Sequence, residues 1–241
     1  MSVKRSLAVA SFFAVSLPVM AADIDTIQNL NQTQFRLLSE DLGAALSYKP
    51  LTPAEPLGLF GFDIGVAATA TKIENPDVFK NAGAGDISNV IVPSLRFNLG
   101  LPFGLDVGVM AGAAPGTNVR LYGAELRWAF VKGGTAMPAI ALRASATQLS
   151  GVDQLEFNTR GVDVSISKGF ALFTPYGGIG KVWVTSTPNV TPNPNNLSEE
   201  SFTLNKAFVG LNMNFVLVNV ALEGDKTGDA TSYGVKLGFR F

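Results

Sequence analysis

Apolar and polar residues alternate with a period of two over the last nine residues, from Tyr233 to Phe241. Neighbouring side chains of a β-strand point to opposite faces, so the pattern predicts a strand with one apolar and one polar face. Lys236 and Arg240 lie on the polar face. The apolar face carries Tyr233, Val235, Leu237, Phe239 and Phe241.

Nine earlier segments show the same alternation, and each can cover the roughly 9–11 residues that a tilted transmembrane strand needs. Turns rich in Gly, Pro and Asp separate them. In one segment, 201–215, Phe208 falls on the polar face, which predicts a β-bulge that shifts the register. The nine segments are 59–71, 89–101, 105–113, 119–130, 139–148, 156–168, 172–187, 201–215 and 218–226.

The first residues predict export. Lys4 and Arg5 precede an apolar run, and Val19-Met20-Ala21 provides a small-residue cleavage site, so residues 1–21 are predicted to be a secretory signal peptide. The chain is 47% apolar and 15% charged, yet no later run is long enough for a transmembrane helix. A β-barrel fits this combination, because its backbone hydrogen bonds are satisfied between strands without long apolar runs.

The closing strand resembles that of bacterial outer-membrane β-barrels, which commonly end in Phe. The resemblance covers residues 59–241 and implies an all-β, membrane-spanning antiparallel up-and-down barrel of about ten strands, twelve being the other possible number. It also implies a location in the outer membrane, contact with its lipids and lipopolysaccharide, and insertion by the barrel-assembly machinery. Tyr233, Phe239 and Phe241 would carry the assembly signal.

The segment before the barrel shows a helical period. Residues 25–41 are predicted to form an amphipathic helix, with Asp25 and Gln28 as a capping box and Gly43 at its end. A short strand at 44–48 and a proline-rich linker follow. Residues 22–57 would thus form one unit before the barrel of residues 58–241. The helix would lie either against the periplasmic mouth or inside the lumen as a plug.

An even strand number returns the C-terminus to the side where the first strand begins, which for this class is the periplasm. The longest connections, after Thr71 and after Thr187, are then extracellular. Aromatic residues are predicted to form an interfacial girdle at the periplasmic ends of the strands. They are Phe60, Phe62, Phe103, Trp128, Phe130, Phe170, Phe173, Phe215, Phe239 and Phe241.

The cost of a charge in lipid decides which face points inward. An Arg or Lys that faces lipid at the midplane costs about 2–4 kcal/mol, so Arg143 and Lys236 are predicted to face the lumen. Arg160 and Lys168 fall on the lipid side, near strand ends. The predicted lumen-facing charged network is Asp63, Arg96, Asp106, Glu125, Arg127, Arg143, Asp163, Lys181, Lys206, Glu223, Asp225, Lys236 and Arg240.

Two functional hypotheses follow from this network, in which acidic and basic residues nearly balance. A selective ion channel is expected to show one sign of charge at its constriction, and ten strands lie near the size at which side chains fill the interior. The first hypothesis is a packed barrel with a structural or binding role. The second is a narrow, plugged route for small hydrophobic or amphipathic molecules. The N-terminal helix and Gly85-Asp86 in an outer loop are similar to hydrophobic-compound and fatty-acid transporter barrels.

Other classes of function are disfavoured. The chain contains no histidine and no cysteine, so histidine-assisted serine catalysis, thiol chemistry and histidine-ligated metal sites are excluded. A barrel enzyme is therefore the third and least favoured hypothesis, and no cofactor is expected. The acidic balance after removal of the signal peptide argues against nucleic acid as a partner. A small apolar ligand stays compatible with the sequence.

Overall fold

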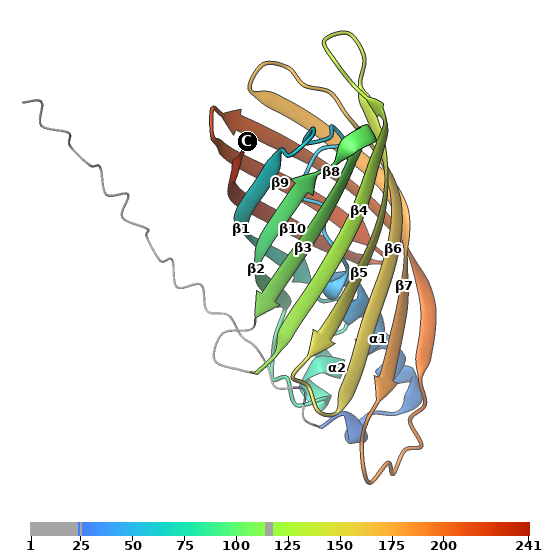
Figure 1. Ribbon diagram of the computed structural model, residues 1–241. Helices are drawn as coiled ribbons and strands as arrows, with labels where there is room; N and C mark the ends of the chain where they lie inside the picture. The colour runs from blue at the N-terminus through green and yellow to red at the C-terminus, as the bar shows by residue number, and fades with distance from the viewer. Residues whose placement is uncertain (1–23, 25, 114–117) are drawn as a thin grey trace, which may run out of the picture.

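The computed structural model describes residue 24, residues 26–113 and residues 118–241, so the predicted signal peptide and Asp25 lie outside the described residues. Ten β-strands form one closed antiparallel barrel, in which β1 pairs with β10 (Figure 1). The predicted fold class is confirmed, with ten strands. They are β1 (Phe62–Lys72), β2 (Asn89–Gly100), β3 (Leu105–Ala113), β4 (Arg120–Lys132), β5 (Ala139–Ser150), β6 (Leu155–Ser167), β7 (Phe173–Pro188), β8 (Glu200–Phe215), β9 (Val218–Thr227) and β10 (Ala230–Arg240).

Strand pairing is continuous around the barrel except between β4 and β5, where the register shifts between Trp128 and Val131. The predicted bulge in β8 is wrong, because β8 pairs with β7 and β9 without a break. Phe208 faces the lumen, where it is buried beside Tyr176 with the ring centroids 6.4 Å apart. An apolar residue on the polar face therefore marks a packed interior position and not a change of register.

The barrel has two unlike ends. The C-terminal mouth is the end where β1 begins and β10 ends, and the distal mouth is the opposite end, which holds the long connection between β7 and β8 (Figure 1). Each predicted girdle residue is exposed, at or near the C-terminal mouth. Relative exposure ranges from 37% at Phe62 to 83% at Phe103.

The N-terminal helix is shifted from its predicted position. A short 3-10 helix, η1 (Ile27–Asn29), precedes α1 (Gln32–Leu46). The capping box lies at Asn31 and Gln34, because Asn31 Oδ1 accepts from Gln34 N at 2.9 Å and Asn31 N donates to Gln34 Oε1 at 3.0 Å. The predicted start near Asp25 is wrong, since α1 begins at Gln32. The predicted end at Gly43 and the predicted strand at 44–48 are also wrong, since α1 continues through Gly43 to Leu46 and no strand follows it there.

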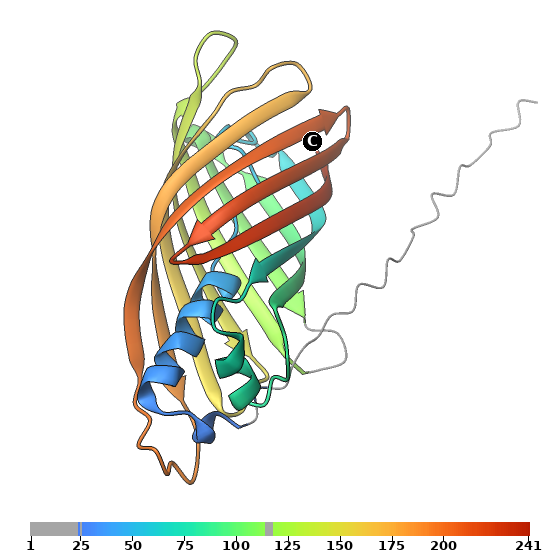
Figure 2. The ribbon, with the colours of Figure 1, turned by 180° about the vertical axis from the view of Figure 1, so that it is seen from behind.

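Helix α1 lies within the barrel at the distal mouth, as seen from behind in Figure 2. It contacts β7, β8, β9, β10, β1 and β2. Of the two locations that the sequence left open, the mouth where the first strand begins and the lumen, the arrangement matches the second, a plug. Helix α2 (Pro76–Asn81) occupies the connection after β1, which the sequence predicted to be a loop, and it packs against α1.

Residues 47–57, here called the linker, run from α1 through the lumen to the C-terminal mouth, and they contain no helix or strand. Near the C-terminal mouth, Phe60 N donates to Gly100 O at 3.0 Å, and the chain then enters β1. The N-terminal segment thus passes through the barrel interior before the chain enters the first strand of the wall. Among the described residues, no helix has the length and apolar character needed to cross a membrane.

Gly43 permits close packing of α1 on β7. A Cβ atom at this position would lie 2.7 Å from Val184 Cγ2 and 3.2 Å from Leu204 Cδ1. We predict that Gly43→Val lowers the free energy of unfolding by about 1–3 kcal/mol, the usual cost of overpacking, and speeds tryptic cleavage after Arg36. Urea unfolding and limited proteolysis of the protein in detergent measure the two effects. Thr33→Val, on the exposed side of α1, is the matched control, and equal behaviour of the two variants would contradict this packing.

Candidate functional site: the plugged lumen

The structure places twelve of the thirteen charged residues of the predicted network on the lumen side of the wall. Eleven are buried, and Arg240 is partly buried near the C-terminal mouth. Asp63, Asp106, Arg127, Arg143 and Lys236 are fully buried. The prediction for Lys181 is wrong, because its side chain is exposed on the outer face of β7.

The error at Lys181 extends along β7, whose faces are opposite to the predicted ones. Tyr176, Val182 and Val184 are buried on the lumen side, while Ile179 and Trp183 are exposed. The prediction assumed that every apolar face meets lipid. In the distal half of the barrel the lumen itself is apolar, since it receives α1, so apolar side chains of β7 point inward there.

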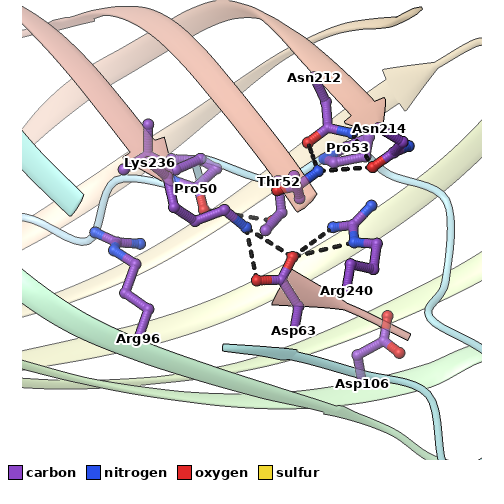
Figure 3. A network of polar contacts seen from close by, with 12 residues as sticks. Pro50, Thr52, Pro53, Asp63, Arg96, Asp106, Asn212, Asn214, Lys236 and Arg240 are labelled. Atoms are coloured by element: carbon purple, nitrogen blue, oxygen red, sulfur yellow. Dashed lines mark hydrogen bonds and ion pairs between the residues drawn. The ribbon is translucent and has the colours of Figure 1, made fainter. Parts of the chain in front are cut away.

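The seam that closes the barrel is joined by an ion triad between β1 and β10. Lys236 Nζ donates to both carboxylate oxygens of Asp63, at 2.9 and 2.7 Å, and Arg240 Nε donates to Asp63 Oδ2 at 3.0 Å. Figure 3 shows both cations converging on Asp63, beside Thr52 of the linker. Asp63 and Lys236 are fully buried and Arg240 is partly exposed, so the triad couples the first strand to the last largely out of contact with water.

A second ion pair holds the linker. Arg127 donates through Nε and Nη2 to Asp106 Oδ2, at 3.1 and 2.7 Å. Its remaining Nη1 donates to Pro53 O at 2.7 Å and to Thr52 Oγ1 at 2.9 Å. Asp106 Oδ1 in turn accepts from Leu57 N at 3.1 Å. Both partners of this pair therefore also bind the linker.

Lys49 of the linker joins the network on the other side of the lumen and was not predicted. It forms a buried salt bridge with Asp225, which also lies 3.3 Å from Lys206 Nζ. Glu223 Oε2 accepts from Leu51 N at 2.8 Å and from the hydroxyl of Tyr176 at 2.9 Å. A single lysine within a proline-rich linker was the available sequence signal, but the pattern of the strands does not reveal which residues it meets.

Six main-chain groups of the linker are bound by wall side chains, each from a different strand. Tyr48 O, Lys49 O and Pro53 O accept from cations on β8, β2 and β4, while the N–H groups of Leu51, Glu55 and Leu57 donate to β9, β6 and β3. A buried extended backbone has polar groups that need partners. The wall side chains that supply them are Lys206, Arg96, Arg127, Glu223, Ser167 and Asp106.

One further buried cluster does not touch the linker's backbone. Arg143 Nε lies 2.9 Å from Glu125 Oε2, and Asp163 is the register partner of Arg143 on β6. Glu125, Arg143 and Asp163 are all buried, so the cluster places opposite charges next to one another on the lumen side of β4, β5 and β6. Among the residues described here, no three acidic, histidine or cysteine side chains are grouped in a way that could hold a metal ion.

The distal half of the lumen is an apolar core built around α1. Phe35, Leu38, Leu42 and Leu46 of the helix are buried together with inward residues of the wall and of α2. A hydroxyl pair adds a polar contact inside this core, because Ser39 Oγ donates to Ser186 Oγ of β7 at 2.8 Å. The wall and α2 residues of this core include Phe79, Leu121, Leu149, Leu155, Phe157, Val182 and Val184.

Asp41 fastens α1 to the connection after β1. Its carboxylate accepts from Glu74 N at 3.2 Å, from Asn75 N at 2.9 Å and from Asn75 Nδ2 at 3.1 Å. Burial raises the pKa of Asp41 above its ordinary value, and the three donors only partly oppose this. The plug is thus fixed at the distal mouth as well as along the linker.

Comparison with known proteins gives fold-level likeness alone. No family model and no curated protein matches the sequence. Among solved structures, the N-terminal barrel domain of OprF from Pseudomonas aeruginosa is similar over 76% of this chain and 99% of that one, with 14% identity and a TM-score of 0.41. OprG from the same organism covers 79% of this chain and 99% of its own, at 11% identity and a TM-score of 0.36. The translocator domain of NalP from Neisseria meningitidis covers 85% of this chain and 94% of its own, at 10% identity and a TM-score of 0.36.

The closed barrel and the distribution of its side chains define the class of the protein. Large apolar residues cover the outside of the wall, and charged residues are buried inside it, which is the reverse of a water-soluble barrel. A closed antiparallel barrel with an even strand number and an apolar exterior is the architecture of bacterial outer-membrane proteins. The protein is an outer-membrane β-barrel.

Loss of the ion triad at the seam is predicted to destabilise the barrel. Asp63→Asn leaves Lys236 buried without a full counter-charge, so we expect it to lower the free energy of unfolding by about 3–5 kcal/mol. The double variant Asp63→Asn with Lys236→Met removes the fully buried unpaired charge and leaves only Arg240, which is partly exposed, so it should recover most of this loss. Urea unfolding followed by tryptophan fluorescence measures both. Glu156→Gln, on the exposed face of β6, is the control, and a loss in the Asp63→Asn variant no larger than that of the control would rule out a stabilising triad.

Proposed function

We propose that this protein is a closed, plugged outer-membrane barrel with a structural or binding role, and that it does not conduct ions in its resting state. The observation that carries the proposal is the occupied lumen. The linker fills the C-terminal half and is bound by side chains from six strands, and α1 fills the distal half with an apolar core. Orientation with the C-terminal mouth toward the periplasm is part of the proposal.

An enzymatic role is not part of this proposal. The sequence has no histidine and no cysteine to activate a nucleophile. Arg96, Asp106, Arg127, Lys206 and Glu223 of the charged network bind the linker's main chain, and Asp63, Lys236 and Arg240 pair across the seam. These roles, holding the linker and closing the barrel, are the ones assigned to the charged network.

Conductance across a planar bilayer tests the seal. We expect the full chain to show no steady conductance. A linker-release variant with Asp106→Leu, Arg127→Leu and Lys206→Met should show frequent openings, because it removes three contacts to the linker backbone and leaves neither Arg127 nor Asp106 buried as an unpaired charge. A disulfide can hold α1 against β7 at the Ser39–Ser186 contact, and we call this disulfide the lock. Adding Ser39→Cys and Ser186→Cys to the linker-release variant should stop the openings on oxidation and restore them on reduction.

The lock has a matched control within the wall. Thr71 on β1 and Ser232 on β10 have hydroxyl oxygens 2.8 Å apart, the same separation as the Ser39–Ser186 pair. A disulfide between cysteines at these two positions should leave the openings of the linker-release variant unchanged. Steady conductance through the otherwise unaltered chain with the Ser39–Ser186 disulfide formed would overturn the proposal.

A second candidate function is passage or storage of a small apolar molecule. An apolar cavity of about 100 Å³ lies at the distal mouth between α1, α2 and the ends of the neighbouring strands, lined by Leu42, Leu46, Phe79, Leu121 and Leu149 among others. An engineered apolar cavity of 150 Å³ binds benzene, so this one suits an apolar group smaller than that ring.

Uptake of an uncharged apolar dye into liposomes separates the two functions, because such a dye gives no current. A conduit predicts uptake by the full chain that falls when the Ser39–Ser186 disulfide forms and when Leu121→Phe fills the cavity. A sealed barrel predicts uptake equal to that of protein-free liposomes in all forms. The Thr71–Ser232 disulfide is again the control for oxidation.

A further inference from the structure

The outer wall carries an apolar groove across strands β5 to β10, on the face directed to lipid. Its volume is about 810 Å³, within the range of about 300–1,000 Å³ that is usual for ligand sites. The side chains along it are largely exposed and apolar. They include Ile140, Val164, Ile166, Ile179, Val209 and Tyr233.

Small residues produce the groove. Gly177, Ala207 and Gly224 lie on the outward face of three adjacent strands, where larger side chains would otherwise cover the wall. Val209 of β8 pairs with Gly177 of β7 on one side and with Gly224 of β9 on the other. A Cβ atom at Gly224 would meet only Tyr233 Cε1, at 4.0 Å, so the space above this glycine is open.

Three exposed cations lie at the distal end of this groove. Lys226 lines the groove and is the register partner of Ala207. Lys181 lies two residues beyond Ile179 on the same face of β7, and Arg160 of β6 is its diagonal neighbour. None of the three forms an ion pair with any carboxylate that the structure describes, and the ammonium group of Lys226 reaches only the carbonyl of Asp229, at 3.4 Å.

Unpaired cations on a lipid-facing wall are costly unless they reach the headgroup layer or meet an anion. All three follow the apolar outward residues of β6, β7 and β9 toward the distal mouth, and Trp183, an aromatic residue suited to the membrane interface, lies next beyond Lys181. This is the depth at which a lipid headgroup meets its acyl chains. Long basic side chains at such a depth can extend toward lipid phosphates.

We propose that this face binds a phosphate-bearing acyl lipid, with one acyl chain in the groove and the phosphate against Lys181, Lys226 and Arg160. Charge complementarity selects this occupant, because an uncharged lipid would leave the cations without partners. In the orientation given above, the lipid belongs to the extracellular leaflet. The site lies outside the barrel and does not depend on whether the plug seals the lumen.

Native mass spectrometry of the full chain in detergent tests the headgroup part, with bis-phosphorylated lipid A and its dephosphorylated form as probes. We expect binding of the phosphorylated probe to weaken about fivefold for each cation removed in Lys181→Gln, Lys226→Gln and Arg160→Gln. Binding of the dephosphorylated probe should not change. Lys132→Gln, at the C-terminal mouth, is the control, and equal effects of Lys132→Gln and Lys226→Gln would overturn the proposal.

The groove is tested by filling it. Gly224→Leu should lower the binding of both probes, since it occupies the path of the acyl chain, and the open space at this position allows the larger side chain. Ala111→Leu adds the same apolar surface on the outward face of β3, away from the groove, and should change neither probe's binding. Urea unfolding of each variant checks that the barrel is intact. Binding by the Gly224→Leu protein as strong as that of the Ala111→Leu protein would refute an acyl chain in the groove.

Discussion

Burial of an extended backbone inside the barrel is the constraint on which the rest of the structure depends. The linker has no strand partner, and a barrel lumen filled by protein has little water to replace one. Its carbonyl and N–H groups therefore need side-chain partners. Arg127 and Asp106 show how the wall meets this need, because each uses part of its hydrogen-bonding capacity for the other and the rest for the linker.

The same constraint explains why the lumen carries nearly balanced charges. Six acidic and six basic wall residues face the interior, and the N-terminal segment adds Asp41 and Lys49. Charges of both signs suit a peptide backbone, which presents donors and acceptors in turn. Pairing across the wall then offsets the cost of burying those that remain. Asp63 with Lys236 and Arg240 serves the barrel alone, since it joins the two strands that close the ring.

The lumen is divided by polarity along its length. The proline-rich linker, whose main-chain groups have no helix or strand partners, occupies the half lined by ions. The amphipathic helix α1 occupies the half lined by Leu121, Val184 and their neighbours. The division also explains which residues of β7 face lipid. Because its apolar residues Val182 and Val184 point inward, the alternate residues Ile179, Lys181 and Trp183 lie on the outside. The orientation of β7 thus connects two features, because its inward apolar residues pack against the plug while its outward residues form part of the charged, grooved face that meets lipid.

The sequence alone determined the fold class and the approximate position of each strand, because period-two alternation is typical of a wall that separates two unlike environments, while the count of ten over twelve came from the structure. It also determined which charged residues avoid lipid, since that cost is large for residues such as Arg143 and Lys236. Only the tertiary structure decided the start of α1 at Gln32, the location of the plug at the distal mouth, the part played by Lys49 and the orientation of β7. These depend on what fills the lumen at each depth, and alternation cannot distinguish an apolar face that meets lipid from one that meets a helix.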